Sequence, residues 1–150
     1  TAELRVARGG GNRTGVGDPL LERLSFIFDG GVGFQGGVCG ALAGAILGIN
    51  LLLGMDIRKT SYLKTIKNFG VGHINLLLDK PIGKPEPFGV GRNIIQRFRE
   101  NAGSIECRSI TDKQFAGWSE FQKHITTSDK CAGLIEFVTG EALNIIKGLT

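Results

Sequence analysis

The apolar positions of this chain recur mainly at helical spacing. In residues 19–29 they lie three and four positions apart, and Asp18 and Pro19 supply an N-cap and a first helical residue. The same spacing returns in residues 93–102, which Gly103 follows at the position where a glycine usually ends a helix. Since no segment alternates convincingly between apolar and polar residues, the pattern predicts an all-α protein.

Residues 38–53 are apolar on every side, with Asn50 as the one strongly polar side chain. A helix of this kind is either the buried centre of a bundle or a membrane span. The run is shorter than the about 20 apolar residues that a span needs, so we expect the core helix of a small bundle and not a membrane helix. Glycines at every fourth position give it one smooth face, which we expect to pack within the chain, or against a second copy in a homodimer: Gly36, Gly40, Gly44 and Gly48.

Shorter elements complete the predicted bundle. They are a helix over residues 62–70, an apolar piece over residues 73–78, a helix capped by Thr111 or Asp112 that extends through Phe121, and a last helix capped by Ser128 or Asp129. Prolines and glycines predict a surface loop over residues 79–91. The Gly- and Arg-rich residues 1–17 are expected to be a flexible or truncated segment, and residues 18–150 a single helical domain.

Composition narrows the function classes. The net charge is only +4, and no run of like charges is longer than Arg58-Lys59, so the basic stripe typical of a nucleic-acid surface is missing. Three cysteines without a signal peptide are typical of a protein from a reducing compartment, so we expect a cytoplasmic location.

Cys39 is the residue at which the sequence most strongly predicts chemistry. It lies in the first turn of the helix predicted over residues 38–53, directly after a glycine-rich loop. Unpaired amide N–H groups and the helix dipole should lower the pKa of a thiol at this place. Redox exchange and metal ligation both use such a thiol, and the alternative is a small apolar side chain buried for packing.

The residues around all three cysteines resemble a known family. Cys39 opens the CGAxxG hexapeptide Cys39-Gly40-Ala41-Leu42-Ala43-Gly44, Cys107 lies in the segment Gly103-Ser104-Ile105-Glu106-Cys107, and Lys130-Cys131 opens the last helix. This arrangement is similar to the C-GCAxxG-C-C family, small helical proteins with four characteristic cysteines from which a redox activity is inferred. The resemblance covers residues 19–55 and 91–147.

The resemblance implies a thiol-based redox or electron-transfer protein that works with an unidentified redox partner protein. By position, Cys39 matches the motif cysteine, and Cys107 and Cys131 match the third and fourth family cysteines. The first family cysteine is expected in or before residues 1–10, and this chain has none there.

Three uses of the thiols stay open. The first is a disulfide between Cys39 and Cys107 or Cys131 that cycles with a partner in an oxidoreductase-like reaction, for which the Cα atoms must lie within about 7 Å. The second is a metal or iron–sulfur site with His73 or His124 as a further ligand, although close C-x2-C pairs are missing. The third is structural burial of all three.

A glycine motif gives an alternative of another class. Gly31, Gly33 and Gly36 form a GxGxxG pattern, and Asp56 follows at the distance of a ribose-binding acid. A dinucleotide site needs a strand before the glycines, and a helix is predicted there instead. The alternative function is therefore a binding module that holds an anion or nucleotide at this loop.

Overall fold

The computed structural model describes residues 23, 25–53, 61–78 and 87–148. They form one 3-10 helix and six α-helices, namely η1 (Phe26–Phe28), α3 (Gly40–Leu53), α4 (Tyr62–Leu77), α5 (Pro87–Ala102), α6 (Cys107–Thr111), α7 (Trp118–Thr127) and α8 (Asp129–Lys147). The β-pairing in these residues is one isolated antiparallel bridge between Val38 and Glu106. The prediction of an all-α protein is confirmed.

Helix α3 is the centre of the bundle, and it packs against α5 and α8. The core consists of apolar side chains from these three helices, chiefly Leu42, Ala45, Ile49, Ile94, Phe98, Leu134, Val138 and Ala142. Gly40 and Gly44 are buried as well, so part of the smooth glycine face lies inside the chain as expected. A helix that is apolar on all sides is stable here because neighbours cover most of its circumference.

Two helices differ in their bounds from the predicted ones for identifiable reasons. Helix α3 begins at Gly40 and not at Val38, the first residue of the predicted helix, because Val38 is paired with Glu106. The two pieces expected around Gly70 are one helix, α4, with Gly70 in its interior. A glycine ends a helix when it adopts a left-handed backbone, as Gly103 does with a φ of +79° after α5.

The helix predicted from Thr111 or Asp112 through Phe121 is wrong. Asp112 ends α6 in a left-handed conformation with a φ of +53°, and α7 begins only at Trp118. Of the loop predicted over residues 79–91, the part from Pro87 belongs to α5, and residues 79–86 lie outside the described residues. Proline fits the first helical position because its missing N–H would have no helical partner there.

Some predictions concern residues outside the described part of the chain. This holds for the segment over residues 1–17 and for most of the helix expected over residues 19–29, whose described end is the 3-10 helix η1. The cap prediction for α8 is confirmed, because Ser128 Oγ accepts a hydrogen bond from the Cys131 N–H at 3.2 Å.

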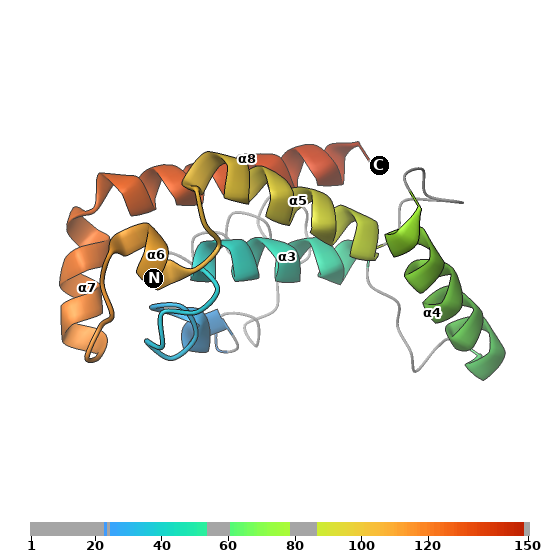
Figure 1. The fold of residues 1–150 in the computed structure, drawn as a ribbon, viewed down its shortest axis with the longest axis horizontal. Helices are drawn as coiled ribbons and strands as arrows, with labels where there is room; N and C mark the ends of the chain where they lie inside the picture. The colour runs from blue at the N-terminus through green and yellow to red at the C-terminus, as the bar shows by residue number, and fades with distance from the viewer. Residues whose placement is uncertain (1–22, 24, 54–60, 79–86, 149–150) are drawn as a thin grey trace.

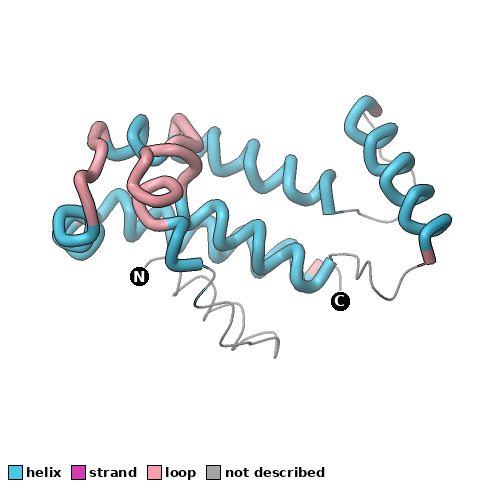
Figure 2. The backbone as a smooth tube through the Cα atoms, turned by 90° about the horizontal axis from the view of Figure 1, so that it is seen from below, coloured by secondary structure: helices cyan, strands magenta, loops and turns pink. Residues whose placement is uncertain are grey.

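The long helices α3, α5 and α8 lie along the longest axis of the molecule (Figure 1). Helices α6 and α7 and the glycine-rich loop before α3 gather at one end, and α4 lies at the other. Most of the described loop backbone is also at the end opposite α4 (Figure 2). Within the described residues, no helix is long and apolar enough to cross a membrane.

Candidate functional site

A short antiparallel pairing brings Cys39 and Cys107 to the same place. The Cys39 N–H donates to the carbonyl of Ile105 at 2.7 Å, and the Cys107 N–H donates to the carbonyl of Gly37 at 2.6 Å. Each cysteine follows the bridge pair Val38 and Glu106 by one residue. Because side chains alternate between the two faces of paired extended chains, the two cysteines are diagonal neighbours on one face.

The glycine-rich loop before α3 packs closely against this pairing. A Cβ atom on Gly31 would lie 2.7 Å from Cys107 Cβ and 2.6 Å from the Gly37 nitrogen. Gly31 also has a φ of +76°, which side chains rarely allow. Likewise, a Cβ atom on Gly36 would lie 2.8 Å from Arg108 Cβ. Two glycines of the GxGxxG pattern therefore let the loop backbone pass directly against the segment that carries Cys107.

The amides of this loop make hydrogen bonds to nearby carbonyl groups of the chain. The N–H of Gly33 donates to Ile27 at 2.7 Å, that of Gly36 to Gly30 at 3.0 Å, and that of Gly37 to Gly31 at 2.9 Å. These bonds account for the sharp turn of the loop. The binding of an anion or nucleotide by Gly31, Gly33 and Gly36 stays a prediction, and the amides of Gly33 and Gly36 already have acceptors within the chain.

All three cysteines line one cavity of about 30 Å³ between α3, α6, α7 and α8. Its other lining residues are Gly30, Gly40, Ala41, Ile110, Thr111, Phe121, Ile125, Leu134 and Ile135. The cavity is almost entirely apolar and has room for one or two water molecules. Cys107 is buried, Cys39 and Cys131 are half-buried, and all three are thiols in this structure.

Each cysteine lies at the beginning of a helix. Cys39 directly precedes α3, and its carbonyl accepts the Ala43 N–H at 3.0 Å. Cys107 is the first residue of α6, and Cys131 lies in the first turn of α8. The partial positive charge at the start of the long helix α3 is expected to favour the thiolate of Cys39. The lowered pKa of the Cys39 thiol remains a prediction.

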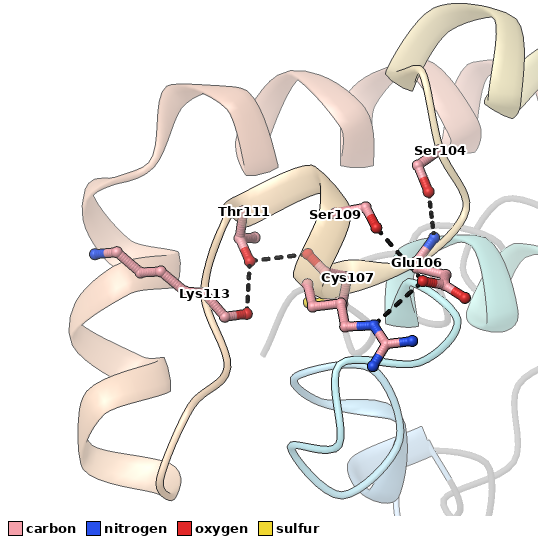
Figure 3. Close-up of polar contacts among 7 residues, drawn as sticks. Ser104, Glu106, Cys107, Ser109, Thr111 and Lys113 are labelled. Carbon is pink, nitrogen blue, oxygen red and sulfur yellow. Dashed lines mark hydrogen bonds and ion pairs between the residues drawn. The ribbon is translucent and has the colours of Figure 1, made fainter.

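Polar contacts hold the turn that presents Cys107 (Figure 3). Thr111 Oγ1 donates to the Cys107 carbonyl at 2.8 Å, and the Glu106 N–H donates to Ser104 Oγ at 3.1 Å. The Glu106 carboxylate accepts from Arg108 Nε at 3.2 Å and from Ser109 Oγ at 3.4 Å. These bonds fix both ends of a five-residue helix that would otherwise be too short to form.

Aromatic rings close the cavity on the side of α7. Phe115 and Phe121 are buried with Cys107, and their ring centroids are 5.2 Å apart in an edge-to-face arrangement. Phe34, from the glycine-rich loop, lies 5.7 Å from Phe121. The loop and α7 therefore meet over Cys107 and shield it from water.

Of the two histidines, the structure brings only one to the cysteines. His124 Nε2 lies 3.8 Å from Cys131 Sγ, whereas His73 lies on α4, with Nδ1 2.8 Å from the Phe69 carbonyl oxygen. Burial lowers the pKa of His124, the nearby Lys113 lowers it further, and Glu120 acts in the opposite direction. Among the described residues, no group of three or more His, Cys, Asp and Glu side chains is arranged to hold a metal ion.

Comparison with known protein families identifies the family of this chain. The family described as "Putative redox-active protein (C_GCAxxG_C_C)" matches residues 5–145, which includes all three cysteines and the segment between Leu53 and Pro87. Comparisons with curated proteins and with solved structures give no match.

Proposed function

Because this chain belongs to the C_GCAxxG_C_C family, whose description is redox activity, we propose that it is a thiol–disulfide redox protein. The observation that carries the proposal is that Cys39, Cys107 and Cys131 all line one apolar cavity. Cysteines that served only to fill space would have no reason to meet from three separate helix starts. Thiols that exchange disulfides with one another have to be neighbours.

We assign the three thiols different roles. Cys39 is the activated thiol, since it precedes the long helix α3 and is half-buried, so a substrate can reach it. Cys107 is buried beside it and is its partner thiol. Cys131 is the resolving thiol, which approaches from the first turn of α8.

The proposed reaction exchanges two electrons with a disulfide substrate. The Cys39 thiolate attacks one substrate sulfur, forms a mixed disulfide and releases the other substrate sulfur as a thiolate. A second cysteine of the chain loses its proton and attacks Cys39 Sγ, which forms an intrachain disulfide and releases the remaining substrate thiolate. Two thiols of the chain are oxidised, the substrate disulfide is reduced, and the two released thiolates take up the two protons.

Location and domain organisation complete the proposal. Cysteines that stay reduced between cycles are typical of a reducing compartment, so we propose a cytoplasmic protein. We also propose that residues 18–150 act as one domain, because α3 in the first half of the chain packs on α8 in the second.

Disulfide mapping tests the proposed function. The reduced protein is treated with oxidised glutathione at neutral pH, alkylated and digested, and the peptides are identified by mass spectrometry. We expect one intrachain disulfide that includes Cys39, and we expect it to be lost in the Cys39→Ser variant. Glutathione adducts on separate cysteines, with no intrachain disulfide in the wild type, would contradict the proposal.

An absorbance spectrum and a metal analysis distinguish the metal or iron–sulfur alternative from the dithiol proposal. Protein purified anaerobically is measured for ultraviolet–visible absorbance and metal content before any oxidation. A dithiol protein absorbs only in the ultraviolet. Stoichiometric iron with visible charge-transfer bands would replace the dithiol proposal with an iron–sulfur site.

A further inference from the structure

The bend between α7 and α8 places an imidazole against one of the thiols. His124 lies in the last turn of α7, Ser128 caps α8, and Cys131 lies one turn further on. This arrangement turns His124 and Cys131 toward each other, with 3.8 Å between Nε2 and Sγ. Since Cys131 also lines the cavity, a proton taken from its sulfur leaves a thiolate that faces the other cysteines.

The surroundings of His124 favour a neutral ring. The side chain is half-buried, and its ring centroid lies 5.1 Å from that of Phe115. Burial and the Lys113 cation lower its pKa, and the Glu120 carboxylate only partly offsets them. The Glu120 carboxylate itself accepts the Ala116 N–H at the start of α7. A neutral imidazole has one nitrogen able to accept a proton, which an imidazolium lacks.

We propose that His124 is the general base for Cys131 in the resolving step. This inference rests on the proposed function and adds the proton transfer that the exchange requires. Cys131 Sγ–H donates its proton to His124 Nε2, and the Cys131 thiolate attacks Cys39 Sγ in the mixed disulfide. The Cys39–substrate bond breaks, the new intrachain bond forms, and the imidazolium returns its proton to the departing substrate thiolate.

The sequence supplies a matched control for this role. The chain has two histidines, and His73 lies on α4, at the opposite end of the molecule from α7 (Figure 1). His73 contacts Phe69 within its own helix, with 6.3 Å between the ring centroids. Its replacement by asparagine removes one imidazole from the protein without touching the cavity.

The test is the rate of iodoacetamide alkylation of each cysteine between pH 5 and 9, resolved by peptide mass spectrometry. In His124→Asn we expect Cys131 to react about 10²-fold more slowly at neutral pH, the lower end of what a positioned base contributes. In this variant, the pH profile of the Cys131 alkylation rate should lose the inflection that follows the His124 titration. Cys39 should keep its rate, and His73→Asn should match the wild type. An unchanged Cys131 profile in His124→Asn would overturn the proposal.

A second measurement covers the case in which His124→Asn does not fold. The His124 ring is titrated by NMR in the wild type and in Cys131→Ser. We expect the wild-type curve to carry a second inflection from ionisation of the Cys131 thiol, and Cys131→Ser to remove it; identical curves would exclude the pair. Both measurements use the reduced protein without substrate, so failure of intrachain disulfide formation would count against the proposed function alone.

Discussion

The two ends of this helical bundle differ in whether their apolar side chains are buried or exposed. At the cysteine end, α6, α7, α8 and the glycine-rich loop enclose an apolar cavity. At the other end, α4 exposes large apolar side chains: Tyr62 is 78% exposed, Leu63 79% and Leu77 88%. Figure 1 shows the two ends separated by the length of α3.

Helix α4 is amphipathic, yet the side that it buries is the polar one. Gly72 and Asn75 are buried, whereas Ile66 and Ile74 on the apolar side are each more than half exposed. At the cysteine end, by contrast, the rings of Phe115 and Phe121 are buried, as is usual for large apolar side chains. The comparison teaches that the spacing of apolar residues reveals an amphipathic helix. It does not reveal what the apolar side of that helix contacts.

The largest contrast between the two ends is expected for stability. Leu42 of α3 is fully buried in the core, and Leu42→Ala should lower the free energy of unfolding by about 2–5 kcal/mol through lost burial and a new cavity. The matched substitution Leu77→Ala should change it by less than about 0.5 kcal/mol. Urea unfolding measures both. Equal losses would show that α4 is packed in solution as tightly as the core.

The next largest loss of stability is expected in the glycine-rich loop. Gly31→Ala combines a left-handed backbone with an overlap against Cys107, so its cost should exceed the about 1–3 kcal/mol of backbone strain alone. Gly33→Ala is the control, because Gly33 has a φ of +61° but no atom within 4 Å of its added Cβ. If both variants lose the same stability in urea, the loop does not support Cys107 by contact.

A smaller effect is expected at the start of α8. Ser128→Ala removes the acceptor of the Cys131 N–H and should cost about 1 kcal/mol of stability. It should also loosen the turn that holds Cys131 against His124. Ser119→Ala, an exposed serine in the first turn of α7, serves as the control in thermal unfolding. A loss of equal size in Ser119→Ala would argue against a specific cap.

The smallest effect concerns pH. The pKa of His124 is lowered in the folded protein, so below the ordinary histidine pKa the unfolded chain binds the proton more readily than the folded one. Stability should therefore fall as the pH drops through the ordinary histidine range and then level off below the folded pKa. His124→Asn should flatten this slope, and urea midpoints between pH 5 and 8 measure it. A slope that persists in His124→Asn would have another origin.

Local signals in the sequence were sufficient for the fold class and for part of the site. The cap at Ser128 and the apolar run before Leu53 predict that Cys131 and Cys39 begin helices, because caps and periodicity act within a few residues. The family resemblance rested on these two places and on the short segment that ends at Cys107. None of this required knowledge of which helices touch.

The remaining features of the site depend on contacts between distant segments. The bridge between Val38 and Glu106 places Cys107 next to Cys39, and helical periodicity carries no information about such a pair. Phe115 was expected on a helix, but it lies in the loop before α7 and fills the space beside Cys107. The residues around His73 and His124 do not show which of the two lies next to a cysteine. That is decided by the bend between α7 and α8.

The most direct test of the account asks whether the thiols are neighbours in solution. A trivalent arsenical such as phenylarsine oxide binds two thiols at once and is displaced by a dithiol. The account predicts that one equivalent binds the reduced protein and protects Cys39 and one further cysteine from alkylation, and that Cys39→Ser weakens this binding strongly. If all three cysteines are alkylated at unchanged rates in its presence, they do not share one cavity, and the redox proposal loses its structural basis.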